Sequence, residues 1–178
     1  DEYVLDSNKH YFELKEVNDE TPIVFESYSN LNYLKKGTLE FTKKDLVNGD
    51  VIPNTIVEIY NENNELIFTG KTDKDGKVII TDLKVGKYYI IEKEAATGYT
   101  ITDEKIYFEL KDNGEITKAE MKDKPITGTL EFTKTDVSTG EPLPNTLIEI
   151  YNEKDELIFS GRTDENGKIT IPEIRYGK

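Results

Sequence analysis

The feature that most constrains this chain is an internal repeat with an offset of 91 residues. The heptapeptide of residues 37–43 (GTLEFTK) recurs unchanged at 128–134, and residues 53–55 (PNT) recur at 144–146. The alignment needs no insertion or deletion over 51 positions. A unit of this length is large enough to fold as an independent domain, and it is too long for one repeat of a solenoid.

The N-terminal part of the chain repeats a different portion of the unit. Residues 11–15 (YFELK) match residues 107–111 at an offset of 96. We therefore expect three parts. Residues 1–36 are predicted to be the C-terminal strands of a preceding repeat, 37–127 a complete repeat, and 128–178 the N-terminal part of a following repeat.

The complete repeat has the pattern of short β-strands separated by turns. Apolar and polar residues alternate in residues 38–43, as expected for a strand with one buried face. Further strand-like runs lie at 65–69, 77–81, 88–91 and 106–110, and Asn-Gly or Asp-Gly pairs at 48–49, 75–76 and 113–114 predict hairpin turns. No segment has a sustained helical period. About seven such strands predict an all-β sandwich.

Composition excludes several classes of function. The formal net charge of −13 disfavours binding to nucleic acid or to an anionic membrane surface. The chain has no cysteine, which excludes disulfides and thiol chemistry, and it has no apolar run long enough to span a bilayer. No phosphate-binding loop or convincing metal-ligand motif is present, so we expect neither a cofactor nor a metal.

Three ionisable residues continue the apolar face of predicted strands. Lys43 follows Leu39 and Phe41 at alternate positions, and Glu92 and Asp123 take the same place in the runs that begin at 88 and 119. Burial of any one alone costs several kcal/mol. In a shared interior, a neutral amine beside a protonated carboxyl forms an amide with loss of water, while a second acid moves the proton. We therefore predict a crosslink between Lys43 and Asp123 with Glu92 as catalyst.

The plainer interpretation is that these residues lie at strand ends and reach solvent. The repeat favours the first interpretation, because Lys134 preserves Lys43 whereas the adjacent Lys44 becomes Thr135. Asn32 is the counterpart of Asp123 at the same offset of 91. Lys134 and Asn32 are thus crosslink candidates in the two partial repeats, with ammonia as the leaving group at Asn32.

The sequence resembles a known family of surface domains. The segments that carry the likeness are residues 37–45 (GTLEFTKKD), 75–77 (DGK), 86–88 (GKY) and 91–99 (IEKEAATGY). They are similar to the B-type repeat of the collagen adhesin family, which also builds the shafts of Gram-positive pilins. The resemblance implies a transthyretin-like, or inverse immunoglobulin, β-sandwich. It also implies an intramolecular isopeptide bond, with Lys43, Asp123 and Glu92 in the roles of lysine, acceptor and catalyst.

These observations predict a structural stalk domain on the outside of a Gram-positive cell, anchored to its wall and without enzymatic activity on external substrates. Expected partners are neighbouring repeats, with head-to-tail pairing between residues 1–36 and 128–178 of different molecules as a further possibility. The alternative is a module that binds a host matrix ligand. Near-identical repeats favour the spacer, since a binding site would need to occur only once. Residues 21–27, the extra residues of the N-terminal part, are the one candidate for a difference.

Overall fold

The structure is a computed structural model that describes residues 7, 9, 11, 32–111 and 114–177. Every helix or strand assigned within those residues is a β-strand, so the prediction of an all-β fold is confirmed. No helix able to cross a membrane occurs in this described part of the chain. Most of residues 1–36, expected to be strands of a preceding repeat, lie outside the described residues.

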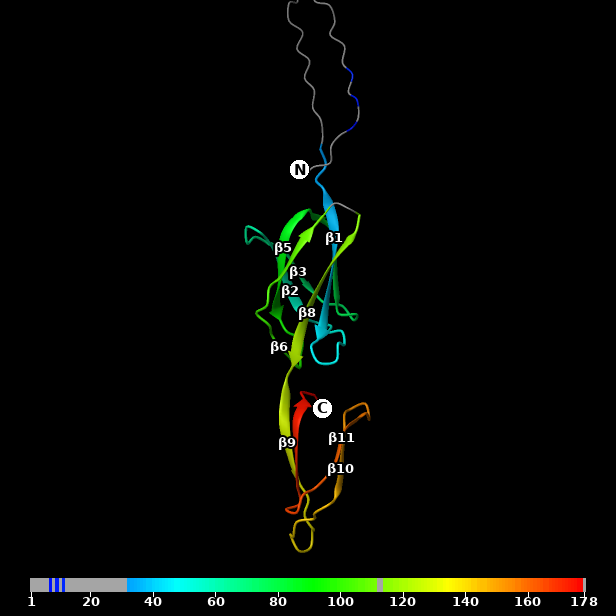
Figure 1. Cartoon of the computed structure of the whole chain (residues 1–178), viewed down its shortest axis with the longest axis vertical. Helices are drawn as coiled ribbons and strands as arrows, with labels where there is room; N and C mark the ends of the chain where they lie inside the picture. The colour runs from blue at the N-terminus through cyan, green and yellow to red at the C-terminus, as the bar shows by residue number, and fades with distance from the viewer. Residues whose placement is uncertain (1–6, 8, 10, 12–31, 112–113, 178) are drawn as a thin grey trace, which may run out of the picture.

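The first sheet of the complete repeat joins the first and last long strands side by side. Its order is β4 (Lys77–Lys84), β1 (Lys36–Asp45), β8 (Ile116–Pro125) and β6 (Tyr99–Thr100). β1 is antiparallel to β4 but parallel to β8, and β8 is antiparallel to β6. Parallel neighbours need a long crossover connection. Here the connection passes through strands of both sheets before the chain returns as β8 (Figure 1).

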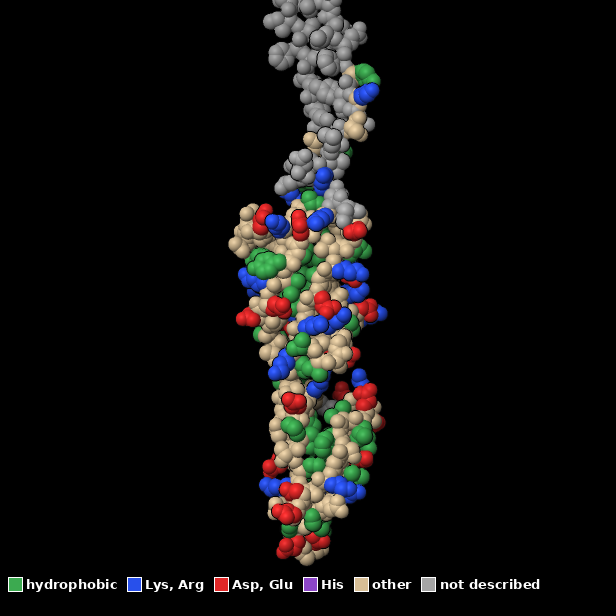
Figure 2. All heavy atoms as spheres, viewed as in Figure 1, with side chains coloured by type: hydrophobic (Ala, Val, Ile, Leu, Met, Phe, Trp, Pro, Cys, Tyr) green, Lys and Arg blue, Asp and Glu red, His purple; other side chains and the backbone are tan. Residues whose placement is uncertain are grey.

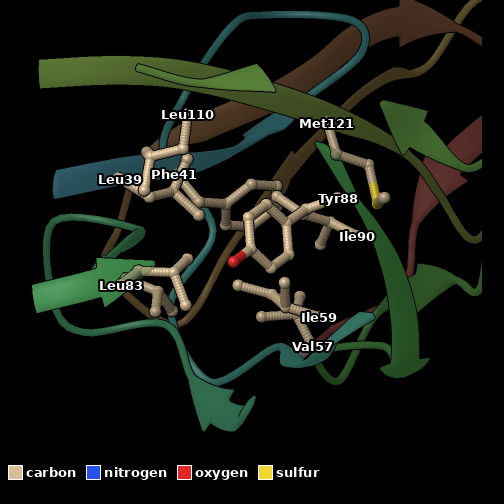
Figure 3. Packing of buried hydrophobic residues seen from close by; sticks show 10 residues of the cluster. Leu39, Phe41, Val57, Ile59, Leu83, Tyr88, Ile90, Leu110 and Met121 are labelled. Atoms are coloured by element: carbon tan, nitrogen blue, oxygen red, sulfur yellow. The ribbon is translucent and has the colours of Figure 1, made fainter. Parts of the chain in front are cut away.

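The second sheet is antiparallel throughout and closes the sandwich. Its order is β3 (Leu66–Lys71), β2 (Ile56–Asn61), β5 (Gly86–Glu94) and β7 (Ile106–Leu110). Inward side chains of both sheets form one apolar core, shown in Figure 3. This core consists of Leu39, Phe41, Val57, Ile59, Val78, Leu83, Tyr88, Ile90, Leu110 and Met121.

Two of the predicted hairpin turns connect the sheets instead. The turn at Asp75-Gly76 joins β3 of the second sheet to β4 of the first sheet. Gly114 likewise lies between β7 of the second sheet and β8 of the first. Asn113 is outside the described residues. The prediction was wrong because a glycine with positive φ reports a sharp turn and not which strands pair. Asn48-Gly49 does close a tight reversal, since Lys44 and Val51 form an antiparallel bridge.

The residues after position 126 form a second set of strands at the same offset of 91. β9 (Thr127–Thr133) pairs with β12 (Lys168–Arg175) as β1 pairs with β4, and β10 (Leu147–Tyr151) pairs with β11 (Leu157–Arg162) as β2 pairs with β3. These strands form the lower part of the molecule in Figure 1. We keep the name complete repeat for residues 37–127 and call residues 128–177 the second repeat.

Equivalent apolar residues are much more exposed in the second repeat. Phe41 is 0% exposed, whereas its counterpart Phe132 is 39% exposed, and Leu39 and Leu130 differ in the same way. Within residues 128–177 no strand takes the place of β5, β7 or β8. Hydrophobic side chains consequently lie at the surface in the lower part of Figure 2.

This difference generates a paired test of core packing. We expect Phe41→Ala to lower the stability of the complete repeat by about 3–5 kcal/mol, since it empties a filled position in the core. Phe132→Ala is the matched control and should cost much less, because its ring is already partly solvated. Native-state hydrogen exchange of the β2 and β5 amides measures the loss of stability in Phe41→Ala. Exchange of the β9 and β12 amides measures it in Phe132→Ala. Equal losses of protection in both variants would contradict this account of the core.

Candidate crosslink site

Lys43 is held in the interior by the backbone of the first strand. The alternation along β1 turns Leu39, Phe41 and Lys43 toward the second sheet, and the Lys43 side chain is fully buried. Its backbone N–H donates to the Gly76 carbonyl at 2.8 Å, and its carbonyl accepts from the Ile52 N–H at 2.9 Å. The strand end is therefore fixed on both sides, and the side chain cannot reach solvent.

The three residues selected from the sequence lie together inside the sandwich. Lys43 Nζ is 2.5 Å from Asp123 Oδ1 and 3.3 Å from Glu92 Oε1. All three side chains are 0% exposed. Because β1 and β8 are parallel and Lys43 is in register with Met121, Asp123 lies diagonally across from the lysine on the same face. The interpretation that these groups reach solvent at strand ends is wrong.

Glu92 is oriented by a residue that the sequence did not indicate. Its Oε2 accepts a hydrogen bond of 2.8 Å from the backbone N–H of Thr102, in the loop after β6. This bond leaves Oε1 directed at Lys43 Nζ. No sequence signal marks Thr102, because its contribution is a backbone N–H that every residue except proline possesses.

The environment favours the protonated form of Asp123. Burial is the largest influence and raises the pKa of Asp123, contact with Lys43 lowers it, and contact with Glu92 raises it, to a net value of about 6. A carboxyl with this pKa holds its proton in part of the molecules near neutral pH. Such a carboxyl can lose water when an amine attacks its carbon, which a carboxylate does poorly.

The contact between Lys43 and Asp123 does not have the geometry of an ordinary hydrogen bond. Within the described residues, Lys43 Nζ, Glu92 Oε1 and both carboxyl oxygens of Asp123 have no hydrogen-bond partner. The 2.5 Å separation of Nζ and Oδ1 is also shorter than a usual N–H···O distance.

The candidates in the partial repeats are placed differently. The backbone of Lys134 makes the same bonds as that of Lys43, to Gly167 and Leu143 at 2.8 and 2.9 Å. Its side chain is nevertheless exposed, and so is Asn32. Among the described residues, neither is brought to a carboxylate that could play the part of Glu92. Their crosslinking stays a prediction.

Asp45 is a further buried carboxylate that the sequence analysis did not select. It continues the inward alternation two residues after Lys43 and accepts hydrogen bonds from Arg175 and Tyr99. The sequence did contain a signal for this residue, because the second repeat has an aspartate, Asp136, at the equivalent position. The described part of the chain contains no group of three or more His, Cys, Asp or Glu residues arranged to hold a metal ion.

Comparison with known proteins identifies related sequences and folds. The SpaA family model, described as a prealbumin-like fold domain, matches residues 37–125 and again 128–178. Serine-aspartate repeat-containing protein E of Staphylococcus aureus (strain MSSA476) is 32% identical over 162 residues, and the bone sialoprotein-binding protein of S. aureus is 32% identical over 163. Each alignment covers 78% of this chain, which spans only 14% of the length of these relatives.

A similar solved structure is that of the Bacillus anthracis TIE protein. It has a TM-score of 0.68 and 41% sequence identity, and the match covers 82% of this chain and 28% of that one. The similarity of both sequence and structure supports the strand arrangement described above. It extends over most of the chain and therefore includes both repeats.

The buried cluster predicts a specific pH dependence when its cation is removed. The pKa of Asp123 is raised above its value in an unfolded chain, so its contribution to stability is lost as pH rises through about 6. Lys43→Ala removes the group that lowers this pKa and prevents crosslinking. We expect the free energy of unfolding of this variant to fall by about 1–2 kcal/mol between pH 5 and pH 7.

Urea unfolding at the two pH values measures this change. Lys134→Ala is the matched control, because it removes an exposed lysine from the equivalent position and should leave the pH profile unaltered. A Lys43→Ala variant with the same stability at pH 5 and pH 7 would mean that its carboxyls are solvated.

Proposed function

Because the chain belongs to the SpaA family of prealbumin-like fold domains, we propose that it is a stalk segment of a Gram-positive surface adhesin or pilin. In this proposal the complete repeat crosslinks itself through an isopeptide bond between Lys43 and Asp123. The observation that carries the proposal is the buried Lys43 Nζ, 2.5 Å from Asp123 and 3.3 Å from Glu92.

The proposed reaction is a condensation within the protein. Lys43 Nζ gives up a proton to a neighbouring carboxylate oxygen and attacks Cγ of the protonated Asp123. The Nζ–Cγ bond forms, one Cγ–O bond breaks, and the leaving oxygen departs as water after it receives a proton. Glu92 is within reach of Nζ and moves the protons. Each molecule reacts once, so this is not enzymatic turnover on an external substrate.

The bond removes the ion pair from the interior and closes a long loop. For a loop of about 80 residues, the chain-entropy model gives a stabilisation of about 4–5 kcal/mol. This is the contribution that a disulfide would make, in a chain that has no cysteine. A secreted domain exposed to solvent outside the cell benefits from such a covalent constraint.

The position of the crosslink also suits a load-bearing role. β1 and β8 lie side by side and parallel, so the chain enters at the upper end of the complete repeat and leaves at the lower end (Figure 1). A pulling force enters at Lys36, follows β1 to Lys43, crosses the amide to Asp123 and leaves through Pro125. The strands β2–β7 are outside this path and carry no tension.

The relatives support a location outside the cell. In the proposal the chain is part of a protein displayed on the surface and anchored to the wall, with neighbouring repeats of the same polypeptide as its partners. One relative is named for binding bone sialoprotein. Direct binding of a host matrix ligand is the alternative function for this chain. We favour the stalk, because the two repeats share strand positions and sequence.

Pairing between residues 1–36 and residues 128–178 of separate molecules stays a prediction, since most of residues 1–36 are outside the described part. The exposed Leu130 and Phe132 offer an apolar face for such pairing.

Intact mass under denaturing conditions tests the crosslink. We expect the unaltered chain to be lighter than its sequence by one water, and Lys43→Ala and Glu92→Ala to have their full sequence masses. Asp123→Asn should lose ammonia instead of water, because the carboxamide nitrogen of the asparagine is then the group that leaves. Lys134→Ala serves as control and should retain the loss of one water. A full sequence mass for the unaltered chain would reject the covalent mechanism.

Single-molecule pulling tests the stalk. With the chain held at its two ends, we expect the crosslinked complete repeat to show no extension for residues between Lys43 and Asp123. Lys43→Ala should release an additional length of roughly 270 Å, the span of about 80 extended residues. If the crosslinked chain releases the same length, the load does not follow the proposed path. Binding of the unaltered chain to immobilised matrix proteins would instead favour the alternative.

A further inference from the structure

The two repeats meet at a buried carboxylate, that of Asp45, two residues after Lys43 in β1. Only Ile126 separates β8 from β9. At this boundary Asp45, whose side chain is 0% exposed, receives Arg175 of the second repeat. Arg175 Nη1 lies 2.6 Å from Oδ2 and Nη2 lies 3.4 Å from Oδ1. Tyr99 donates its hydroxyl to Oδ2 at 3.0 Å.

Asp45 is held in place by its own repeat. Its Oδ1 accepts the backbone N–H groups of Val47 and Asn48 at 2.7 and 3.1 Å, so the turn after β1 fixes the carboxylate. Burial alone would raise the pKa of Asp45, but the hydrogen bonds from Arg175, the two backbone groups and Tyr99 lower it to about 2. The carboxylate is therefore charged near neutral pH, and its position is fixed before a cation binds.

Arg175 is directed to this carboxylate by the backbone of the second repeat. Glu173 has a φ of 58° in a β-bulge of β12, and such bulges re-aim the side chains that follow them. Beyond the arginine, Tyr176 N–H donates to the Ile126 carbonyl at 2.8 Å, and Ile126 N–H donates to the Gly98 carbonyl at 2.8 Å. These bonds tie the end of β12 to the complete repeat.

The same parts recur at the offset of 91. Asp82, the counterpart of Glu173, has a φ of 59°, and Lys84 is the counterpart of Arg175. The bond from Tyr176 to Ile126 recurs as Val85 N–H to the Lys35 carbonyl at 3.1 Å. In the second repeat, Asp136 accepts the N–H groups of Ser138 and Thr139 at 2.7 and 2.9 Å, as Asp45 accepts those of its own turn.

We propose that Asp45, together with Tyr99, is a receptor site for the basic residue that ends the equivalent of β12 in the following repeat, and that this contact fixes the orientation of consecutive repeats. Each repeat then has a carboxylate receptor at the end of its first strand. It also has a basic side chain, Lys or Arg, that binds the receptor of the preceding repeat. The partner of Asp136 is by this reasoning the Arg or Lys of a further repeat. The contact is independent of the crosslink.

Residual dipolar couplings of the backbone amides, measured on the full chain, test this proposal. In the unaltered chain, couplings from residues 37–125 and 128–177 should fit one alignment tensor. In Arg175→Gln we expect the common tensor to be lost, with smaller couplings in the second repeat. Arg175→Lys should keep it, since Lys84 occupies the equivalent position. Lys168→Gln is the control, because Lys168 forms an exposed pair with Glu131 in the same repeat.

A second variant keeps the test valid if Arg175→Gln unfolds the second repeat, which loss of protected β9 and β12 amides would show. Asp45→Asn keeps an oxygen for the turn but removes the charge, and it should also abolish the common tensor. Lys43→Ala should preserve it, so failure of the crosslink and failure of this proposal are distinguishable. A common tensor in both Arg175→Gln and Asp45→Asn would overturn the proposal, as would an equal loss in Lys168→Gln.

Discussion

Burial of the Lys43 ammonium group is the constraint on which the rest of the structure depends. A cation inside a sandwich costs several kcal/mol unless it is compensated within hydrogen-bonding distance. Compensation comes from two carboxyls on strands far apart in sequence, Glu92 on β5 and Asp123 on β8. The register of β1 with β8 and the packing of one sheet on the other must both be correct for this contact. The cluster thus specifies the fold as well as any chemistry that follows from it.

Much of the fold could be predicted from the sequence, because its information is local and repeated. Alternation along 38–43, 88–92 and 119–123 correctly placed Lys43, Glu92 and Asp123 inside, since the side-chain direction on a strand has a period of two. Pairing of the strands could not be read in this way. The turn at Asp75-Gly76 looks like a hairpin, yet its flanking strands belong to different sheets. Which strands pair is decided by tertiary packing and not by the turn.

Other parts of the site were not predictable for physical reasons. Thr102 acts through its backbone N–H, which leaves no trace in the side-chain pattern. The strand β2 was missed because apolar residues occur on both of its faces. Val57 and Ile59 point into the core, whereas Ile56 and Tyr60 flank Glu58 on the opposite face. Lys134 is exposed because the described residues of its repeat contain no strands equivalent to β5, β7 and β8 that would cover it. Local sequence identity with Lys43 therefore does not ensure the same environment.

The crosslink and the boundary between repeats are adjacent in the same strand end. Asp45 follows Lys43 by two residues, and Leu46 N–H donates to the Asp123 carbonyl at 2.9 Å. The two contacts share this strand end, but no side chain takes part in both. In the proposed stalk, the amide carries load within one repeat, and the pair of Asp45 and Arg175 separately orients the next repeat.

The proposed crosslink between β1 and β8 has a consequence for cleavage by proteases. An amide between Lys43 and Asp123 makes a covalent ring of the intervening chain, which contains β2–β7 and the loops at Glu62–Glu65 and Thr102–Lys105. A single cut anywhere in that ring opens it but leaves both fragments joined through the side chains. For a protein on the outside of a cell, a nick in the most exposed turns would then leave the polymer unbroken.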